Sequence, residues 1–395
     1  MIVQKTVILK LACSDTDLLD RTLQAYTNGM NYVSAVVYNL GKPKGSIALQ
    51  KMVYPALRNQ IGLKSQMACN VVRQVTGTYK TLQKQVKSKK SSWQQIEYSP
   101  TSMTFSYGRD YSLNGDRIGL TTVEGRKKYL FIRYPQMEQY LDGTWHFGAS
   151  KMVKHKDGSY YFHLCCEKKV DMIEITETSP IMGVDVGQNF LAVATTTDKN
   201  CRFFCGGKAK DLRNTYSNMR KRLQSKGTKS AKRMLKHLSG KEKRLMTAMN
   251  HQVSKEIVEF AVKKGVNVIG LEDLTGIRDR TTTSKKHRYT HHSWSFYELQ
   301  MFIEYKANEK GISVIPVDPA YTSQTCPRCN HVSKTNRQKR SFVCEQCGYS
   351  LHADLIGARN IELRARTSRY ILGVQGCSQP PVRDLSTCRV SSPVL

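Results

Sequence analysis

Two stretches near the start of the chain repeat apolar residues with a helical period. In the first, apolar side chains recur at alternating steps of four and three, at Leu19, Leu23, Tyr26, Met30, Val33 and Val37. In the second they recur at steps of four, at Met67, Val71, Val75 and Tyr79. Such spacing gathers the apolar side chains on one face of an amphipathic helix. We therefore predict a helical module over residues 13–91.

On both sides of this module the apolar period changes to two, which is the period of a strand. Residues 2–11 alternate in this way, and residues 129–134 and 152–164 predict further strands, with a hairpin turn at Lys156-Asp157-Gly158. We expect the first strand to join the later ones. The helical module is then an insertion into a small β-barrel domain of residues 1–12 and 92–178.

A third pattern begins near Pro180 and predicts an alternation of strands and helices. The expected strands lie at residues 181–186, 191–195, 202–204, 266–271 and 312–317. Helical periods are found at residues 253–261, 296–307 and 353–364. Three strands, helix, strand, helix, strand, helix is the element order of an RNase H-like fold. We assign this fold to residues 179–320 and 351–366, and we expect residues 367–395, which show no periodicity, to be a flexible tail.

The charge of the chain changes the expected partner. Lys and Arg number 62 against 31 Asp and Glu, which gives a net charge of +31. Residues 21–96 carry twelve Lys and Arg and no acid, and residues 208–244 carry fourteen against two acids. This excess favours an anionic partner, with nucleic acid first and an acidic membrane second. No apolar run approaches the ~18 residues that span a bilayer, so we expect an intracellular protein without a membrane partner.

Four of the twelve cysteines have the spacing of a metal site. Cys326-x2-Cys329 and Cys344-x2-Cys347 form two CxxC pairs separated by fourteen residues. Two such knuckles supply four thiolates to one tetrahedral Zn²⁺. Because four thiolates leave no open coordination position, we predict a structural zinc ribbon over residues 321–350. A chance pair of CxxC motifs is the alternative.

Three carboxylates stand at corresponding places in the predicted RNase H order. Asp185 and Glu272 end the first and fourth strands, and Asp354 opens the last helix. In that fold the first and fourth strands are neighbours, about 4.8 Å apart, and the last helix brings its acid over both. Clustered carboxylates need cations, and two Mg²⁺ ions can clamp a phosphodiester there. Asp273 is the rival to Glu272, but strand alternation turns it away.

The acid-free helical module also offers candidate contacts to nucleic acid. Lys64 and Ser65 precede Gln66, Asn70 and Arg73, which share one helix face by their spacing. Gln and Asn can pair with adenine edges, and Arg with guanine, so this face could read a duplex. The alternative is that these residues are solvated or contact phosphates and RNA. Further basic candidates are Lys80, Lys84, Arg220 and Arg222.

Together these motifs resemble TnpB, the RNA-guided nuclease family of bacterial and archaeal insertion sequences. The matching segments are Gly183–Ala192, Gly270–Leu274, Tyr321–Cys329, Cys344–Gly348 and His352–Asp354. Over about residues 180–365 the resemblance implies RuvC acids at Asp185, Glu272 and Asp354 and zinc ligands at the four cysteines. The N-terminal half resembles the family in layout, as a wedge barrel with an inserted recognition module.

The resemblance also implies partners. The protein would be a monomeric ribonucleoprotein with a guide RNA from its own element. It would read a short motif beside double-stranded target DNA, while base pairing reads the rest. We would expect it in a prokaryotic cytoplasm, associated with the nucleoid through DNA. Two departures from the family pattern are Ile356, where Asn is usual, and Asn330, where Gly is frequent.

Other functions remain open at this point. A DNA transposase or integrase also uses an RNase H fold, although its acids usually run Asp, Asp, Glu rather than Asp, Glu, Asp. A nuclease-inactive RNA-guided repressor and a zinc-ribbon binding protein would need no acid triad. A miniature type V CRISPR effector shares the chemistry and differs in the source of its guide.

Overall fold

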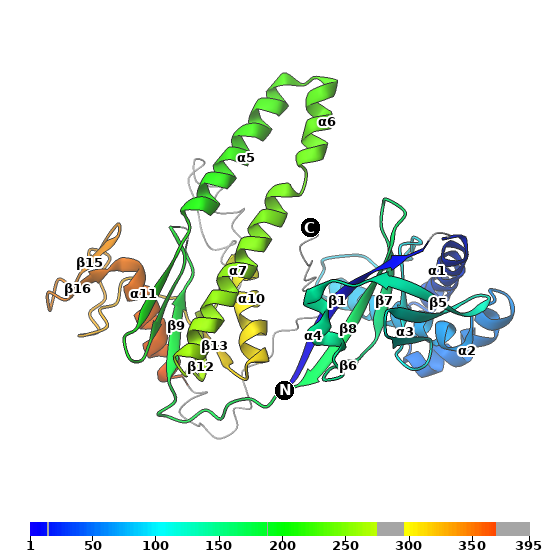
Figure 1. Cartoon of the computed structure of the whole chain (residues 1–395), viewed down its shortest axis with the longest axis horizontal. Helices are drawn as coiled ribbons and strands as arrows, with labels where there is room; N and C mark the ends of the chain where they lie inside the picture. Colours follow the sequence, from blue (N-terminus) through cyan, green and yellow to red (C-terminus); the bar gives the residue numbers. More distant parts are fainter. Residues whose placement is uncertain (14–15, 188, 275–295, 369–395) are drawn as a thin grey trace. The chain divides into compact units, whose positions relative to one another are not determined.

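The computed structural model describes residues 1–13, 16–187, 189–274 and 296–368. The chain divides into two units, one of residues 2–168 and one of Met1 with the residues from Lys169 onward (Figure 1). Almost all of the predicted tail lies outside the described residues. None of the described helices is long and apolar enough to cross a membrane.

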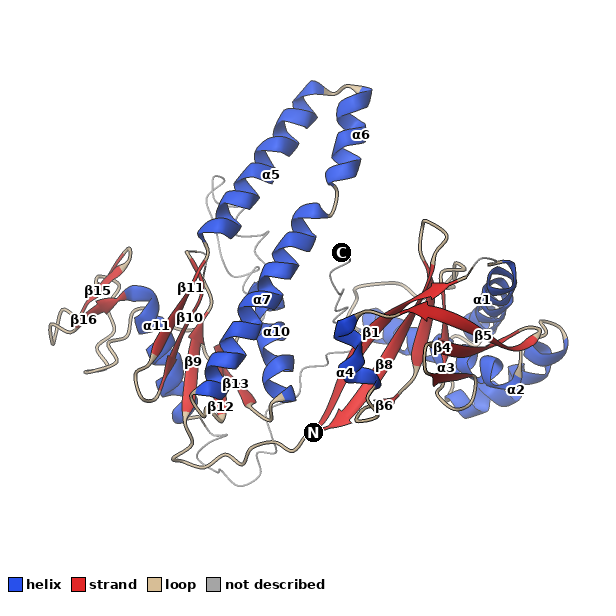
Figure 2. Ribbon diagram, in the orientation of Figure 1, coloured by secondary structure: helices blue, strands red, loops and turns tan. Residues whose placement is uncertain are grey.

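One curled sheet of eight strands forms the frame of the unit 2–168 in its described residues (Figure 2). The strands are β1 (Ile2–Ala12), β2 (Ser102–Phe105), β3 (Tyr111–Asn114), β4 (Arg117–Thr122), β5 (Gly125–Ile132), β6 (His146–Phe147), β7 (Ser150–Lys154) and β8 (Tyr160–Lys169). Their order is β2-β7-β8-β1-β5-β4-β3, with β6 paired to β8. The first strand therefore joins the later ones, as its alternation predicts. The expected hairpin turn connects β7 to β8, with Gly158 at φ +83°.

Three helices lie between β1 and β2, so the helical module is an insertion into the sheet domain. They are α1 (Asp17–Asn39), α2 (Ser46–Asn59) and α3 (Ser65–Lys87). The apolar faces predicted for the first and third helices are buried, and they share one core with the sheet. Helix α2 was not predicted, although Leu49, Val53 and Leu57 recur at steps of four and are buried. The short η1 (Pro135–Met137) and α4 (Glu138–Leu141) follow β5.

A second sheet of five strands forms the centre of the other unit. Its strands are β9 (Ile181–Asp185), β10 (Phe190–Thr196), β11 (Cys201–Cys205), β12 (Val268–Glu272) and β13 (Ser313–Val317). The order is β11-β10-β9-β12-β13, with β9, β10 and β11 antiparallel and β9, β12 and β13 parallel. The first and fourth strands of the unit, β9 and β12, are neighbours, as the RNase H order requires.

Helices cover both faces of this sheet (Figure 1). On one face, α7 (Lys241–Lys263) and α10 (Phe296–Glu309) pack against the side chains of Met182, Val184 and Ile269. On the opposite face, α11 (Ala353–Arg366) packs through Ile361 and Ala365. The two faces thus use alternate residues of each strand.

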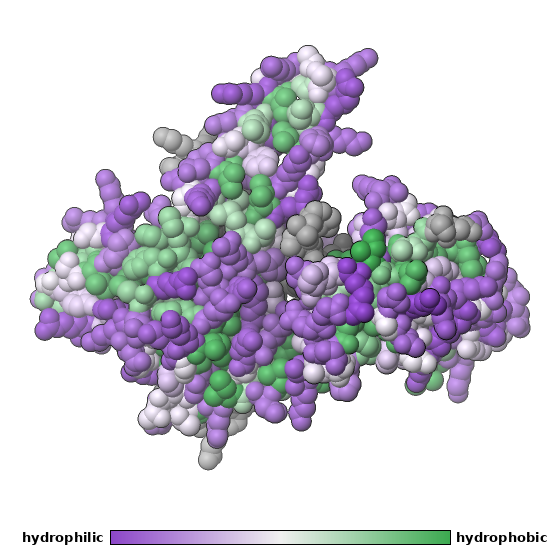
Figure 3. Space-filling view, in the orientation of Figure 1, coloured by the Kyte–Doolittle hydropathy of each residue, from purple (hydrophilic) through white to green (hydrophobic). Residues whose placement is uncertain are grey.

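The basic segment between β11 and β12 forms more than one helix. Helices α5 (Gly207–Lys226) and α6 (Lys229–Leu238) precede α7, and Gly227 and Gly240 separate the three with positive φ of 62° and 77°. Hydrophilic side chains line both edges of the α5–α6 hairpin (Figure 3). Between β13 and α11 the chain forms a small antiparallel sheet of β14 (Arg337–Gln338), β15 (Ser341–Val343) and β16 (Ser350–His352). This insert carries the four cysteines.

Candidate active site and metal centre

Asp185 and Glu272 lie side by side at the ends of β9 and β12. The strands pair in parallel with Gly183 opposite Gly270 and Val184 opposite Leu271, so the next residues along are the two acids. Both glycines face α11. A Cβ on Gly183 would lie 2.1 Å from the carbonyl oxygen of Ala358, and one on Gly270 would lie 2.8 Å from the Ala365 Cβ. Because side chains alternate along a strand, both acids project to the α11 face.

Asp185 is held against the first turns of α11. A Cβ on Gly357 would lie 2.6 Å from Asp185 Oδ2, so the carboxylate fills the space that the missing side chain leaves. Burial, together with the charges of Glu272 and Asp354, raises the pKa of Asp185 to about 8, while the charge of Arg337 opposes the shift. The charges of Glu272 and Asp354 therefore both act on Asp185, where β9, β12 and α11 converge.

Hydrogen bonds hold both the backbone and the side chain of Glu272 in place. Its carbonyl accepts a hydrogen bond from Gln300 Nε2 at 2.8 Å, and its Oε1 accepts one from Thr322 Oγ1 at 2.5 Å. Burial raises the pKa of Glu272, the Thr322 hydroxyl and Arg364 lower it, and the nearby Asp318 raises it. Thr322 opens the cysteine-bearing insert, and sequence reasoning did not single it out as a site residue.

Asp354 lies in the first turn of α11, next to the helix cap. His352 caps this helix, since its Nδ1 accepts a hydrogen bond from Asp354 N at 3.3 Å. The Asp354 carboxylate accepts a hydrogen bond from Arg337 Nη2 at 2.9 Å, and both side chains are partly buried. Arg337 comes from β14 of the insert. A guanidinium therefore neutralises one of the three acids, and sequence reasoning missed this pairing.

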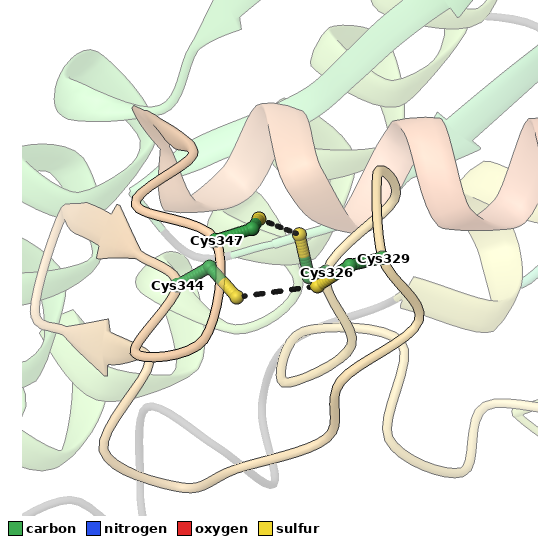
Figure 4. A group of neighbouring side chains, drawn as sticks. All are labelled: Cys326, Cys329, Cys344 and Cys347. Carbon is green, nitrogen blue, oxygen red and sulfur yellow. Dashed lines mark hydrogen bonds between the residues drawn. The ribbon is translucent and has the colours of Figure 1, made fainter.

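The four cysteines gather as their spacing predicts (Figure 4). All four sulfur atoms lie within 4.8 Å of one another, and Cys326–Cys347 and Cys329–Cys344 are 3.6 and 3.5 Å apart. Sulfurs at 2.3 Å from a tetrahedral Zn²⁺ would be about 3.8 Å apart, so the cluster fits that ion. Among the described residues, no other group of three or more possible metal ligands comes this close together. The oxygen atoms of Asp185, Glu272 and Asp354 are therefore farther apart than these sulfur atoms.

Each cysteine pair sits on a tight turn of the same design. Asn330 N donates to Cys326 O at 2.9 Å, and Gly348 N donates to Cys344 O at 3.0 Å. Both donors have left-handed backbones, with φ of 60° for Asn330 and 69° for Gly348. Asn is the residue other than Gly that tolerates this conformation best, so Asn330 can stand where the family often has Gly. Ile356, the other departure, is buried in the core of the insert.

The residues predicted to contact nucleic acid fall into two groups, those exposed to solvent and those whose side chains are bound by other residues of the protein. The exposed ones are Lys64, Ser65, Arg73, Lys80, Lys84 and Arg222. Arg220 instead forms a 2.5 Å ion pair with Glu242 of α7. Gln66 is half-buried, and its Nε2 donates to Asn70 Oδ1 at 3.0 Å.

Asn70 is a structural residue rather than an exposed one. Its side chain is buried, and Nδ2 donates to Thr104 O at 3.0 Å and to Asp110 Oδ2 at 2.7 Å. Burial raises the pKa of Asp110 to about 6, and its hydrogen bonds from the Ser106 backbone and Asn70 oppose the shift. Asn70 thus joins α3 to the β2–β3 connection, and only Gln66 of the two predicted amides remains near the surface.

Two segments of the chain match known protein families. Residues 163–278 match a family described as a probable transposase, and residues 296–361 match the Cas12f1-like TNB domain. A TnpB-like protein of Methanocaldococcus jannaschii is 34% identical over 158 residues, which cover 39% of this chain and 56% of that protein. These matches make the chain similar to TnpB-like proteins over its second half.

The proteins similar to this chain also include CRISPR-associated ones. The Cas12f1 endodeoxyribonuclease of Syntrophomonas palmitatica is 29% identical over 276 residues, which cover 65% of this chain and 54% of that protein. The chain thus spans about half the length of the curated relatives it matches. Among solved structures, a Cas12f1–sgRNA–target DNA complex has a TM-score of 0.59 at 16% identity, covering 89% of this chain and 83% of that one. This likeness establishes the fold.

Proposed function

We propose that this chain is an RNA-guided DNA endonuclease that cuts phosphodiester bonds at Asp185, Glu272 and Asp354. The observation that carries the proposal is the convergence of these acids where β9, β12 and α11 meet. The pKa values of Asp185 and Glu272 are both raised, first by burial and then by nearby negative charge. Titratable groups that are shifted by specific neighbours are frequent at active sites. The assignment makes residues 179–320 and 351–366 a RuvC-like nuclease domain.

The residues at this site suit divalent cations. Asp185 and its neighbours are hard oxygen donors, which Mg²⁺ prefers, and the Arg337 guanidinium already provides a positive charge to Asp354. Asp185, Glu272 and Asp354 would hold two Mg²⁺ ions, and these ions would supply charge stabilisation to the oxygens of a phosphodiester. Thr322 would orient Glu272 for this task, and His352 and the helix start would orient Asp354.

The remaining parts of the chain are proposed to bind nucleic acid. The net charge of +31 suits a guide RNA paired with target DNA, held by its phosphates. The curled sheet of residues 1–12 and 92–178 would be the wedge barrel, and residues 13–91 the recognition module that reads the target-adjacent motif. Residues 321–350 would bind one structural Zn²⁺ through Cys326, Cys329, Cys344 and Cys347, and would contact the target. A protein that cuts chromosomal DNA would be found at the nucleoid.

A second candidate function, that of a miniature CRISPR effector, shares all of this chemistry. It is favoured by the Cas12f1 relative that matches the larger share of the chain. The two functions differ in the origin of the guide RNA, which would come from the flank of a mobile element in the first case and from a repeat array in the second.

The test starts from the RNA that the protein retains. We expect the full chain, expressed with its native flanking DNA, to copurify with one RNA species as a monomeric complex. Loaded with that RNA, it should cut a plasmid library that carries the matching target beside randomised flanking sequence, in the presence of Mg²⁺. Asp185→Asn should bind the same targets and leave them intact. Sequencing the retained RNA assigns its origin and separates the two candidates.

Two results would contradict the proposal. One is a loaded complex that binds matched targets but leaves them uncut in Mg²⁺ and Mn²⁺, which is the behaviour of an RNA-guided repressor. The other is cleavage by Asp185→Asn at the parental rate, which would remove this acid from the chemistry.

A further inference from the structure

Three aromatic rings pack together beside the carboxylates. The ring centroids of Phe190 and Phe203 are 5.0 Å apart. The centroid of the His352 ring lies 5.6 Å from that of Phe190 and 5.4 Å from that of Phe203. All three pairs meet edge to face. The rings come from β10, from the edge strand β11, and from the residue that caps α11. We call Phe190, Phe203 and His352 the aromatic cluster.

Strand register ties this cluster to the candidate active site. Phe203 stands opposite Val193, and Val193 stands opposite Asp185. Residues that face each other across antiparallel strands project to the same side, and Val193 packs against Leu355 and Ala358 of α11. Phe203 therefore lies in one row with Asp185, on the face that carries the acids. Two strand spacings put the Phe203 backbone about 10 Å from that of Asp185.

The core of the unit does not account for Phe203. Phe190 packs into a small buried cluster with Val193 and Leu355, so its ring has a structural partner. Phe203 belongs to none of the buried clusters of the described residues, and 37% of its surface is exposed. Phe203 is therefore a partly exposed ring that two other rings hold in place, on the sheet face that carries Asp185.

The surroundings favour a nucleic-acid strand as the occupant. Arg340 is exposed, and its carbonyl accepts a hydrogen bond from Ala353 N at 2.8 Å, which fixes this cationic residue next to His352. Arg337 is already paired with Asp354, so Arg340 is the cation that is left for a phosphate here. A cation suited to a phosphate thus lies beside a ring suited to a base. Aromatic rings with basic neighbours are the usual means of holding single-stranded nucleic acid.

From these observations we propose that Phe203, supported by Phe190 and His352, stacks on a base of the DNA strand that is being cut. This inference rests on the proposed function and names a further part of its site. A distance of about 10 Å is covered by one to three nucleotides, since a stacked strand rises ~3.4 Å per nucleotide. The stacked base therefore belongs to a nucleotide within three of the scissile phosphate, and it would fix that phosphate relative to Asp185.

The test compares a change in the protein with a change in the substrate. Phe203→Leu keeps an apolar side chain and removes the ring, and an abasic nucleotide at each of the three positions on either side of the cut removes one base at a time. Single-turnover cleavage is measured for the guide-loaded full chain. Loss of one stacked base should slow cleavage about 5- to 150-fold. Phe203→Trp should retain the parental rate.

Coupling between the two changes distinguishes stacking from a merely structural role. At one position, the abasic substrate and Phe203→Leu should each slow cleavage by a similar factor, and their combination should slow it no further. Tyr297→Leu, which removes another half-exposed ring from the helix on the opposite sheet face, should cut at the parental rate. The proposal is overturned if Phe203→Leu cuts normally, or if the two effects multiply at every position.

A binding measurement keeps this proposal separate from the proposed function. The full chain in EDTA is mixed with a single-stranded oligonucleotide that carries 2-aminopurine, whose fluorescence falls when it stacks. Quenching should be present in the parent and in Phe203→Trp and lost in Phe203→Leu. Equal quenching in all three variants rejects the stacking platform even if the complex cuts. If the parent quenches but never cuts guided targets, the platform stands and the nuclease proposal fails.

Discussion

Gly183→Ala tests how closely α11 must approach the sheet. The added Cβ would lie 2.1 Å from the Ala358 carbonyl oxygen and 2.4 Å from the Glu362 backbone nitrogen. Ordinary carbon contacts lie at about 3.5–4.0 Å, so α11 would have to withdraw by more than 1 Å. Both contacts are to backbone, and no side-chain rotation relieves them. We expect a loss at the upper end of the range for overpacking, about 3 kcal/mol or more.

The withdrawal should affect both stability and function. A loss of about 3 kcal/mol lowers the melting temperature of a unit of this size by roughly 6–12 °C. Because α11 carries Asp354, its movement should also separate that carboxylate from Asp185 and Glu272 and reduce cleavage more than binding. Calorimetry of the full chain, read alongside guided cleavage, measures both effects.

Gly270→Ala provides the matched control. Its Cβ would lie 2.8 Å from the Ala365 Cβ, which is a side-chain contact. Ala365→Gly removes that atom and should recover most of the stability lost in Gly270→Ala. Ala358→Gly should give Gly183→Ala no relief, because there the contact is a carbonyl oxygen. A Gly183→Ala protein that melts within a degree of the parent, or that Ala358→Gly restores, would refute this account of the sheet–helix contact.

Three further predictions concern single residues. In EDTA, the free energy of unfolding should fall as pH rises from about 4 to about 8, because the folded pKa of Asp185 is raised to about 8 and ionisation of this acid is unfavourable in the fold. Asp185→Asn should flatten this part of the plot of melting temperature against pH, and an unchanged slope in this variant would contradict the prediction. Cys344→Ser should bind less than one Zn²⁺ per chain by elemental analysis and expose residues 321–350 to proteolysis, whereas full occupancy would show that Cys344 is no ligand. Asn70→Ala should destabilise the unit 2–168 by about 1–3 kcal/mol, because Asp110 loses a buried hydrogen-bond partner, while Gln66→Ala should melt at the parental temperature. If the Gln66→Ala complex cuts a library of flanking sequences with the parental preference, Gln66 does not read the motif.

Sequence pattern alone was sufficient for the arrangement of the central strands. Apolar strands ending in Asp185 and Glu272, together with the RNase H element order, predicted that β9 and β12 are neighbours, and the register agrees. The four-cysteine spacing likewise predicted the sulfur cluster. In both cases each half of the contact has its own sequence signal, an apolar strand that ends in an acid or a CxxC pair, and a known fold or ion brings the halves together.

Contacts made at long range could not be predicted in this way. Arg337 reaches Asp354, and Thr322 reaches Glu272, only because the insert folds back onto α11 and the sheet. Asn70 illustrates a different limit. It lies next to the buried Val71 at the boundary between the two faces of α3, and whether it faces solvent depends on Asp110, forty residues away in the chain.

The insert is connected to two of the three acids, which bears on what the proposed zinc site would do. Asn360 of α11 donates to the carbonyls of Thr322 and Thr325, both at 2.7 Å, so α11 fixes the first turn of the insert. Thr322 in turn holds Glu272, and Arg337 of β14 holds Asp354. A ribbon that served only to bind DNA would need neither contact. Because a structural zinc site loses its shape without metal, removal of the ion should disturb the carboxylates as well as the ribbon.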